Sequence, residues 1–514
     1  MDNNLFNQIL ESKPQFNGKL RKEKWGGLYL IRETLTMEGI NETSYDILKC
    51  CNGQNTVADI IRNITNEYLA NPEVIFNEVL EYLIYLMLRK VVEVDSLVID
   101  NNFYENIKIE RHEGEEISNW KAISGMNYNV ESEEKPNFFE GKGVIGVEPN
   151  TLSAPINVLI EFTNNCNLAC VHCFADSGIG TEIIDGRIKG ELSTEEWKHV
   201  IDNICDAGTF EIIVSGGEAL MRKDIFEIME YITQKTGGFC LLSNMTLITN
   251  EIAEKLKNVG CYKVEGNLDG YDDKTYDEFR GVQGSFQKTV LGIKATLKAG
   301  IPVRCNITAT KINIYNLKEV VKTAYNLGVR ELVAVPLEPG GRARVSWEEL
   351  EIPMSDSKKL MKYYDEVKQW ALDKYGNEFL LVVPTSNFVR DEDLRLKQIM
   401  DPNRLMPFCG AGKYHCSVDP YGNVILCPTA GNSIKINPRN CLKSDFKDIW
   451  KNADVFREIR EFILPCYDNC DCINCTGGCH VRSFQKTGRV VGNPGIDCRK
   501  YQIEQLGVME KERS

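Results

Sequence analysis

The sequence lacks a hydrophobic run long enough to cross a membrane, and it lacks an excess of basic residues. Its longest apolar stretch, VLEYLIYLML at 79–88, is shorter than the roughly 20 residues that span a bilayer. The first residues, MDNNLFNQIL, contain no basic segment followed by an apolar run, so no export signal is expected. Lysine and arginine total 60 against 74 aspartate and glutamate residues, and the net charge of -14 opposes binding to a phosphate backbone. We therefore expect a cytoplasmic protein that binds no membrane and no nucleic acid, and that acts on a small molecule or a peptide.

Cysteine is the residue in excess, with 19 copies, more than a reduced enzyme needs for packing. Disulfide bonds are a poor explanation in a chain without an export signal. Three cysteines fall within 166–173, nine more lie between 409 and 479, and Cys498 follows. Metal held by thiolates is the natural interpretation of these two groups. The other six lie in apolar helix or strand patterns and are expected to be small buried side chains: Cys50, Cys51, Cys205, Cys240, Cys261 and Cys305.

Residues from 155 onward alternate between strand-like and helix-like segments. Six apolar runs of strand length begin with INVLIEFT and end with ELVAVPLEP. Amphipathic segments separate them, near 194–206, 224–236, 249–258, 285–299 and 316–327. The alternation predicts an α/β fold with a parallel sheet covered by helices, either an incomplete barrel or a doubly wound sheet. In both arrangements functional residues gather at the C-terminal ends of the strands.

The first 96 residues form a separate pattern. The segment GGLYLIRETLTM predicts two short strands with a turn at Arg32–Glu33, and three amphipathic helices follow, beginning at NETSYDILKCC. Strands followed by three helices indicate a winged-helix-like domain, a shape that usually binds DNA. Residues 1–95 carry ten basic against 14 acidic residues, which favours a peptide ligand instead. Residues 97–150 show no sustained period and are expected to be a linker or an extended segment that lies over another domain.

The stretch NNCNLACVHCF at 164–174 places three cysteines directly after the first strand of the alternating region. A structural zinc site needs four ligands, and His172 would reach the same ion only through a cramped turn. Haem attachment needs a histidine where Phe174 stands. A cubane iron–sulfur cluster held by three cysteines keeps one iron open, and an open iron can bind a substrate.

With its surroundings, the Cys-x3-Cys-x2-Cys loop resembles the signature of the radical S-adenosylmethionine (radical SAM) enzymes, which have a partial (β/α)6 barrel of the TIM type. The resemblance implies that Cys166, Cys170 and Cys173 hold a catalytic [4Fe–4S] cluster. Its open iron would chelate the amino and carboxylate groups of S-adenosylmethionine. SGGEAL at 215–220 is similar to the family's Gly-Gly-Glu motif, in which the carboxylate meets the ammonium group of the cofactor.

Further motifs of the resemblance imply additional contacts with S-adenosylmethionine. LLSN at 241–244 and NLDG at 267–270 match positions on the third and fourth strands that contact ribose and carboxylate in relatives, although a serine is commoner than Asn267. The arginine of DEFRG resembles one that pairs with the cofactor carboxylate. The cofactor-binding residues implied in this way are Phe174, Gly216, Gly217, Glu218, Ser243, Asn244, Asn267, Asp269 and Arg280.

The cysteine-rich C-terminus resembles the SPASM extension of this family, which holds two auxiliary [4Fe–4S] clusters. Spacing alone also permits a zinc ribbon. The segment VDPYGNVI predicts a tight hairpin that brings Cys416 and Cys427 together. The second ligand of the 466–475 span is displaced by one residue from the family pattern, so the choice between Cys470 and Cys472 stays open. The resemblance implies Cys409, Cys416, Cys427 and Cys479 for the nearer cluster, and Cys466, Cys470, Cys475 and Cys498 for the farther one.

The N-terminal segment INETSYDILKCCNGQNTVADII resembles the PqqD-like recognition element of peptide-modifying enzymes. In that family the leader of a ribosomally made precursor peptide adds a strand to the small sheet. The implied partners are a precursor peptide and a flavodoxin- or ferredoxin-type reductant. The expected domains are a recognition element at 1–96, a linker at 97–150, the barrel at 151–345, a bridging region at 346–400 and the SPASM domain at 401–514.

The resemblance implies modification of a precursor peptide, and a thioether between a cysteine sulfur and another residue's carbon is the first expectation. Carbon–carbon cross-linking or another radical modification, such as epimerisation, is the alternative. Sulfatase-type maturation is less expected, because those relatives carry an aspartate where Pro428 stands. A non-catalytic iron–sulfur regulator is the alternative hypothesis from a different functional class.

Overall fold

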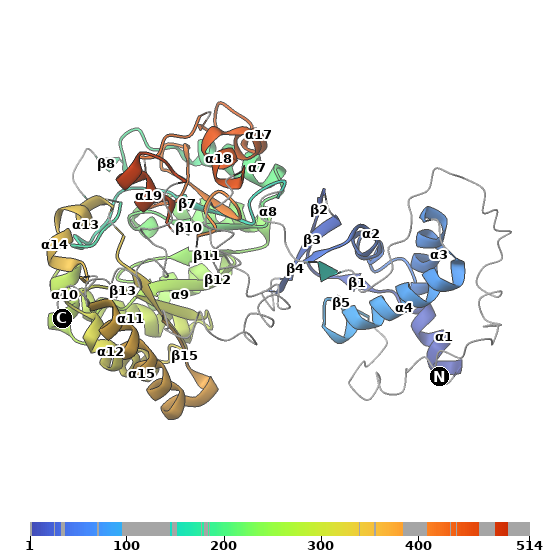
Figure 1. Ribbon diagram of the computed structural model, residues 1–514, viewed down its shortest axis with the longest axis horizontal. Helices are drawn as coiled ribbons and strands as arrows, with labels where there is room; N and C mark the ends of the chain where they lie inside the picture. Colours follow the sequence, from blue (N-terminus) through green and yellow to red (C-terminus); the bar gives the residue numbers. More distant parts are fainter. Residues whose placement is uncertain are drawn as a thin grey trace, which may run out of the picture. The chain divides into compact units, whose positions relative to one another are not determined.

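A computed structural model of the chain describes two units, each with its own core. The smaller unit contains the described residues up to 145, and the larger unit begins at Leu152 (Figure 1). The residues that the structure describes are 3–24, 26–31, 36–68, 71–94, 144–145, 152–175, 177–178, 183–184, 186–338, 340–353, 356–383, 409–431, 433–437, 439–461 and 479–491.

The smaller unit pairs an antiparallel sheet with four helices. Its strand order is β2-β3-β4-β6, and the short strands β1 and β5 form a separate pair. The structure confirms the two strands and three helices expected from the sequence, whereas the expected turn at Arg32–Glu33 lies outside the described residues. It adds α1, β1, β2, β5 and β6, and β6 falls within the segment expected to be a linker. The elements are α1 (Asn3–Glu11), β1 (Gln15–Phe16), β2 (Lys19–Glu23), β3 (Gly26–Ile31), β4 (Thr36–Ile40), α2 (Glu42–Cys50), α3 (Val57–Glu67), α4 (Pro72–Leu88), β5 (Val92–Glu93) and β6 (Val144–Ile145).

Side-chain caps explain where the helices of this unit begin. The side chain of Asn41 accepts a hydrogen bond from the backbone N–H of Ser44 at the start of α2. Thr56 and Asp59 form a reciprocal capping box at the start of α3. Behind the caps, the apolar face of α3, including Ile60 and Ile64, is completely buried with the side chains of α4.

The larger unit is built on a nine-stranded sheet with the order β15-β14-β13-β12-β11-β10-β7-β16-β17. All neighbours pair in parallel except β16 and β17, which form an antiparallel hairpin. The six strands expected from the sequence are confirmed as β7 (Asn157–Glu161), β10 (Glu211–Ser215), β11 (Phe239–Leu242), β12 (Cys261–Asn267), β13 (Val303–Ala309) and β14 (Glu331–Pro336). The additional strands are β15 (Leu380–Val382), β16 (His415–Val418) and β17 (Val424–Ile425).

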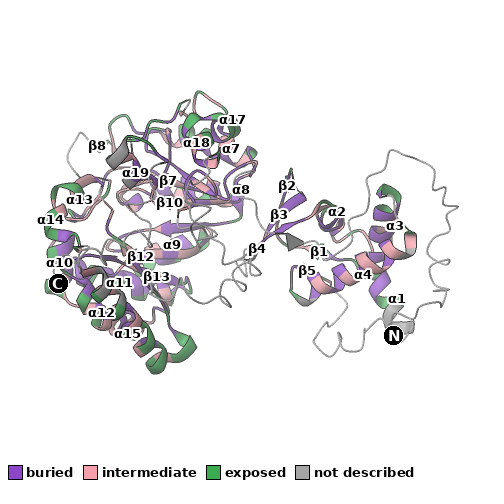
Figure 2. Cartoon of the chain, viewed as in Figure 1, coloured by how far each residue is buried: buried purple, intermediate pink, exposed green. Residues whose placement is uncertain are grey.

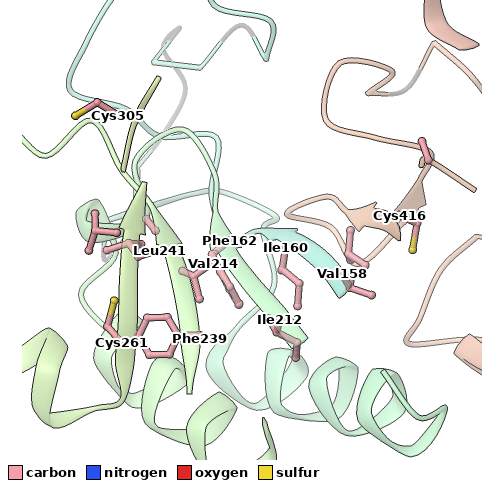
Figure 3. Packing of buried hydrophobic residues seen from close by; sticks show 14 of the residues in the cluster. Val158, Ile160, Phe162, Ile212, Val214, Phe239, Leu241, Cys261, Cys305 and Cys416 are labelled. Carbon is pink, nitrogen blue, oxygen red and sulfur yellow. The ribbon is translucent and has the colours of Figure 1, made fainter. Parts of the chain in front are cut away.

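Helices between the strands bury one face of this sheet. Alternate strand residues such as Val158, Ile160 and Val214 point into a shared hydrophobic core (Figure 3), and Figure 2 shows buried residues running along the central strands. In the described ranges, no helix is long and apolar enough to cross a membrane. The helices of four or more residues are α7 (Thr194–Asp206), α8 (Ile225–Thr236), α9 (Asn250–Asn258), α10 (Asp273–Arg280), α11 (Ser285–Lys298), α12 (Leu317–Leu327), α13 (Gly341–Val345), α14 (Trp347–Leu350), α15 (Ser357–Tyr375), α17 (Phe446–Asn452), α18 (Asp454–Glu461) and α19 (His480–Thr487).

The opposite face of the sheet carries charged side chains on β12, β13 and β14. Glu265 lies 3.1 Å from the Nζ atom of Lys263 and 3.3 Å from a guanidinium nitrogen of Arg304. Arg304 also lies 3.6 Å from Glu331 on the next strand. Arg304 and Glu331 lie in the first half of β13 and β14, and Glu265 lies just past the middle of β12. The C-terminal strand ends are therefore left for the functional loops.

Candidate functional site

The loop after β7 carries the three cysteines Cys166, Cys170 and Cys173. Its backbone folds back on itself, with the N–H of Cys173 donating to the carbonyl of Cys170 at 3.3 Å. Cys170 is buried and the other two are half-buried. Burial raises the pKa of the Cys166 thiol to about 11, so this thiol is protonated near neutral pH. A bound metal would deprotonate it, because a coordinating thiol ligates as the thiolate.

The Gly-Gly-Glu segment packs directly on the start of the cysteine loop. Gly216 adopts φ +144°, and a Cβ atom there would lie 2.6 Å from the carbonyl oxygen of Thr163. A Cβ atom on Gly217 would lie 2.5 Å from the carbonyl oxygen of Asn165. The backbone N–H groups of Gly217 and Glu218 donate to these same two carbonyls. Glycine is therefore required for the close approach of the two loops.

Glu218 is the buried acceptor at the centre of this region. Its carboxylate accepts hydrogen bonds from the hydroxyl of Ser243 at 3.0 Å and from the backbone N–H of Asn244 at 2.8 Å. Burial raises the pKa of Glu218 to about 7, although these donors oppose the shift. The Asn244 side chain in turn donates toward the sulfur of Cys166 at 3.9 Å. The structure thus brings together the cysteine loop, SGGE and LLSN, as the sequence predicted.

Asp269 and Arg280 form a buried ion pair beside the cysteine loop. The Asp269 carboxylate also accepts a hydrogen bond from the backbone N–H of Thr308 at 2.6 Å. Arg280 donates toward the sulfur of Cys170 at 3.5 Å. Asp269 therefore holds Arg280 in place, and its expected contact with the cofactor stays a prediction.

Two other predicted cofactor residues lie at the border of the site. Asn267 ends β12 half-buried, and its carbonyl accepts a hydrogen bond from the hydroxyl of Tyr276 at 3.2 Å. Phe174 is 40% exposed, the one predicted residue with a large accessible face. An exposed ring at the end of the cysteine loop is suited to stacking against a bound molecule.

His172, set aside as a ligand in the sequence analysis, packs among side chains of the site. Its ring stacks on Phe279 with centroids 4.2 Å apart, and its Nε2 atom lies 4.0 Å from the Asp269 carboxylate. Burial, and then the charges of Arg280 and Arg342, lower the pKa of His172 well below its usual value. The ring is therefore neutral at physiological pH.

The loop after β14, which was not predicted from the sequence to belong to the site, contains Gly340, Gly341 and Arg342. Arg342 donates from Nε to the carbonyl of Cys170 at 2.9 Å and from a terminal nitrogen to the carbonyl of Ser177 at 2.7 Å. Gly341 adopts φ +46° and lies against the backbone of Cys173. The available signal was a Gly-Gly pair followed by arginine at a strand end, the position where functional loops gather.

The C-terminal cysteines fall into two groups in the described part of the chain. Cys409, Cys427 and Cys479 are neighbours: burial raises the pKa of the Cys427 thiol, and the thiols of the other two raise it further. Cys416 is buried in the hydrophobic core near Cys441 and Arg460, and the other three cysteines pack against the same core. The remaining predicted ligands lie outside the described residues: Cys466, Cys470, Cys472, Cys475 and Cys498.

The residues at the β7 loop fit an iron–sulfur cluster whose open iron binds the amino and carboxylate groups of an amino acid. Three thiolates are the soft donors that cubane iron prefers, and the two glycines let the Gly-Gly-Glu segment pack against the cysteine loop. Glu218 offers a buried carboxylate to an ammonium group. Among the described residues, no three histidine, cysteine or acidic side chains are placed to hold a single metal ion.

Comparison with known families identifies two segments of the chain. Residues 160–325 match the radical SAM superfamily, and residues 30–92 match coenzyme PQQ synthesis protein D (PqqD). The mycofactocin maturase MftC of Mycobacterium tuberculosis is 31% identical over 355 residues, 68% of this chain and 83% of that protein. The chain belongs to the radical SAM superfamily. An AdoMet-dependent heme synthase of Methanosarcina barkeri is 30% identical over 345 residues, 65% of this chain and 94% of that protein.

Solved structures share the fold of this radical SAM protein at low sequence identity. Streptococcus suis SuiB bound to the precursor peptide SuiA matches with a TM-score of 0.61 and 15% identity, over 95% of this chain and 100% of that one. The enzyme anSMEcpe, with bound AdoMet and Cp18Cys peptide, matches with a TM-score of 0.52 and 16% identity, over 70% and 100% of the chains. The resemblances stated from the sequence, to radical SAM enzymes and to PqqD, are confirmed.

Membership of the superfamily implies S-adenosylmethionine and a [4Fe–4S] cluster, and the residues described above fit both. When bound, S-adenosylmethionine supplies a radical that takes a hydrogen atom from an unactivated carbon. Cys166, Cys170 and Cys173 would hold the cluster. Glu218 would orient the cofactor ammonium, and Arg342 and the two glycines before it keep the cysteine backbone in place.

Proposed function

We propose that this protein modifies a ribosomally made precursor peptide and joins a cysteine sulfur to a carbon of another residue as a thioether. The observation that carries the proposal is the presence of both a radical SAM site and a PqqD segment in one chain. A relative is named a maturase, and the fold neighbour SuiB was solved with a precursor peptide. The relative named a heme synthase matches this chain over a similar length, so the PqqD segment is what favours a peptide over a porphyrin.

The proposed division of labour follows the domains. Residues 1–96 are a winged-helix-like recognition element for the leader, 97–150 a linker, 151–345 the partial barrel, 346–400 a bridge, and 401–514 a SPASM domain. Two auxiliary [4Fe–4S] clusters in the last of these accompany the cluster at the β7 loop. A flavodoxin- or ferredoxin-type protein supplies electrons in the cytoplasm.

The proposed reaction balances as follows. The substrate carbon gives up a hydrogen atom, the cysteine gives up its thiol proton, and the carbon–sulfur bond forms. One electron left over by this closure passes to the nearer auxiliary cluster. The product is therefore lighter than the precursor by one pair of hydrogens for each cross-link. Carbon–carbon cross-linking has the same balance but leaves the cysteine free, whereas epimerisation leaves the mass unchanged.

Mass spectrometry of the peptide tests the proposal. The probe is the peptide encoded by the short reading frame beside the gene, incubated anaerobically with reconstituted enzyme, S-adenosylmethionine and reductant, and then alkylated at free thiols. A pair of hydrogens lost together with one blocked cysteine supports the thioether. The same loss with a freely alkylated cysteine rejects the thioether and favours a carbon–carbon link. A protein that never cleaves S-adenosylmethionine would instead be the non-catalytic regulator.

A further inference from the structure

A carboxylate from the barrel lies among the cysteines of the C-terminal region. Glu338 follows β14 by two residues, and its Oε2 atom accepts a hydrogen bond from the thiol of Cys479 at 3.7 Å. Burial raises the pKa of the Cys409 thiol, and the Glu338 charge contributes to that shift. Because Cys427 neighbours both Cys409 and Cys479, four acidic side chains meet here: three thiols and one carboxyl. We call these four residues the auxiliary site.

Cys416, the fourth cysteine expected for this cluster, faces away from the auxiliary site because of the hairpin register. Ser417 pairs with Ile425 and Val418 with Val424, so the same register places Cys416 opposite Leu426 rather than Cys427. Cys416, Val418, Val424 and Leu426 all belong to the hydrophobic core. Successive strand residues point to opposite faces, and Cys427 therefore leaves the hairpin on the other side.

Glu338 also belongs to the loop that supports the catalytic cysteines. Gly341 contacts the backbone of Cys173 only three residues later, a stretch of at most ~11 Å of backbone. The same loop continues to Arg342, which binds the carbonyls of Cys170 and Ser177. The Glu338 carboxylate is thus held by a loop whose other end is fixed to the β7 loop.

We propose that, of the cysteines that the structure describes, Cys409, Cys427 and Cys479 supply the thiolates of the nearer auxiliary cluster, and that the Glu338 carboxylate occupies its fourth iron until a cysteine of the peptide replaces it. The inference rests on the proposed function, because it names the site where the peptide thiolate binds. The displaced Glu338 carboxylate takes the proton of the peptide thiol, so one anionic oxygen ligand is exchanged for one anionic sulfur ligand and the net charge at the cluster is unchanged. Iron in such clusters prefers the softer thiolate, which gives the exchange its direction.

The first test counts iron in a full-length background variant in which Cys166, Cys170 and Cys173 are alanine. Cys427→Ala in this background should lose the iron of about one cluster, whereas Cys416→Ala should lose none. Cys441→Ala is the matched control, because this thiol is buried near Cys416 in the same core. Circular dichroism and a melting curve establish that each variant is folded.

The two failures of this test are distinguishable. If Cys416→Ala lost as much iron as Cys427→Ala, the cluster would have four cysteine ligands and the inference alone would be overturned. If the background variant bound no iron at all, the auxiliary clusters of the proposed function would fall together with the inference.

The second test follows the cluster itself by electron paramagnetic resonance of the reduced background variant. The probe is N-acetylcysteine amide, which carries the thiol of a peptide cysteine. Added thiol should shift the spectrum when Glu338 is present. In Glu338→Gln, whose amide is a weaker ligand, the half-maximal thiol concentration should fall by about tenfold. In Glu338→Cys a fourth protein thiolate should make the spectrum insensitive to the probe.

Glu349→Gln is the matched control, because Glu349 is an exposed carboxylate eleven residues farther along the chain. It should respond to the probe as the background variant does. A spectrum that ignores the thiol with Glu338 in place, or a response unchanged by Glu338→Gln, would overturn the assignment of the fourth iron to Glu338.

Discussion

Gly341 and Cys173 are in contact through their backbones: a Cβ atom on Gly341 would lie 2.5 Å from the carbonyl oxygen of Cys173. Gly341 also has φ +46°, a conformation that residues with a side chain rarely adopt. The loop after β14 therefore fits the cysteine loop only with glycine at this position. Because neither partner is a flexible side chain, relief of the clash requires a shift of one of the two loops.

Gly341→Ala should displace the cysteine loop and destabilise the iron-loaded protein by about 1–3 kcal/mol. Less iron should remain at the β7 loop after anaerobic reconstitution, and cleavage of S-adenosylmethionine should fall in proportion. Gly376→Ala is the matched control, because Gly376 has φ +58° but nothing within 4 Å of its added Cβ. Equal iron retention by both variants would show that the contact with Cys173 is not needed.

Arg342 makes a second connection between the same loops, and its replacement should speed the loss of the cluster. Arg342→Ala removes the two hydrogen bonds to the carbonyls of Cys170 and Ser177, each charge-assisted and worth about 1.5–3 kcal/mol. Lysine cannot form the same fork, so Arg342→Lys should rescue little. The measurement is the rate of cluster loss to a chelator. Arg344→Ala, at an exposed position two residues on, should match the unaltered protein.

Glu218 should make the binding of S-adenosylmethionine depend on pH. Burial raises its pKa to about 7, so the carboxyl group is mostly ionised at pH 8 and mostly protonated at pH 6. Only the ionised form attracts the cofactor ammonium, and affinity should therefore fall as pH is lowered through 7. Glu218→Gln should weaken binding about 10- to 100-fold at pH 8 and remove this dependence. Equilibrium dialysis measures both, with iron content as the control for an intact cluster.

Much of the central sheet was predictable because the order of its strands follows the chain. The alternating apolar runs predicted β7 and β10 to β14. The family resemblance assigned Glu218, Ser243 and Asn244 to one cofactor, and the structure brings these three residues together. The strands β15, β16 and β17 were not predicted to belong to the sheet. β15 and β17 have three and two residues, too few for a period to show, and β16 joins the sheet through tertiary pairing with β7.

The roles of Arg342 and Cys416 depended on information that sequence patterns do not carry. Arg342 matters because tertiary folding brings its loop to residues 170–177, far away in the chain. Counting cysteines could not show that Cys416 faces the core, because the hairpin register decides the face. Its motif assigns Asp269 to the cofactor, and its hydrogen bonds to Arg280 and Thr308, which the motif does not predict, come from tertiary folding.

The last prediction concerns where the leader of a precursor peptide docks. The segment GGLYLIRETLTM contains β3 and the first residues of β4, and the outer side of β4 is paired with the edge strand β6. Gly39 lies opposite Ile145, and Ile40 lies opposite Val144. The other edge, β2, consists largely of charged residues, a composition that discourages the addition of a strand. A leader that adds to β4 must therefore displace β6, and its apparent affinity is reduced by the fraction of molecules in which β6 is paired.

Ile145→Pro removes a backbone N–H from β6 and should tighten leader binding several-fold, measured by fluorescence anisotropy with the leader of the neighbouring gene's peptide. Hydrogen exchange at Gly39 and Ile40 gives the second readout: these amides should lose protection in Ile145→Pro and regain it when the leader is added. Unchanged affinity, or amides that stay unprotected with leader bound, would place the docking site away from β4.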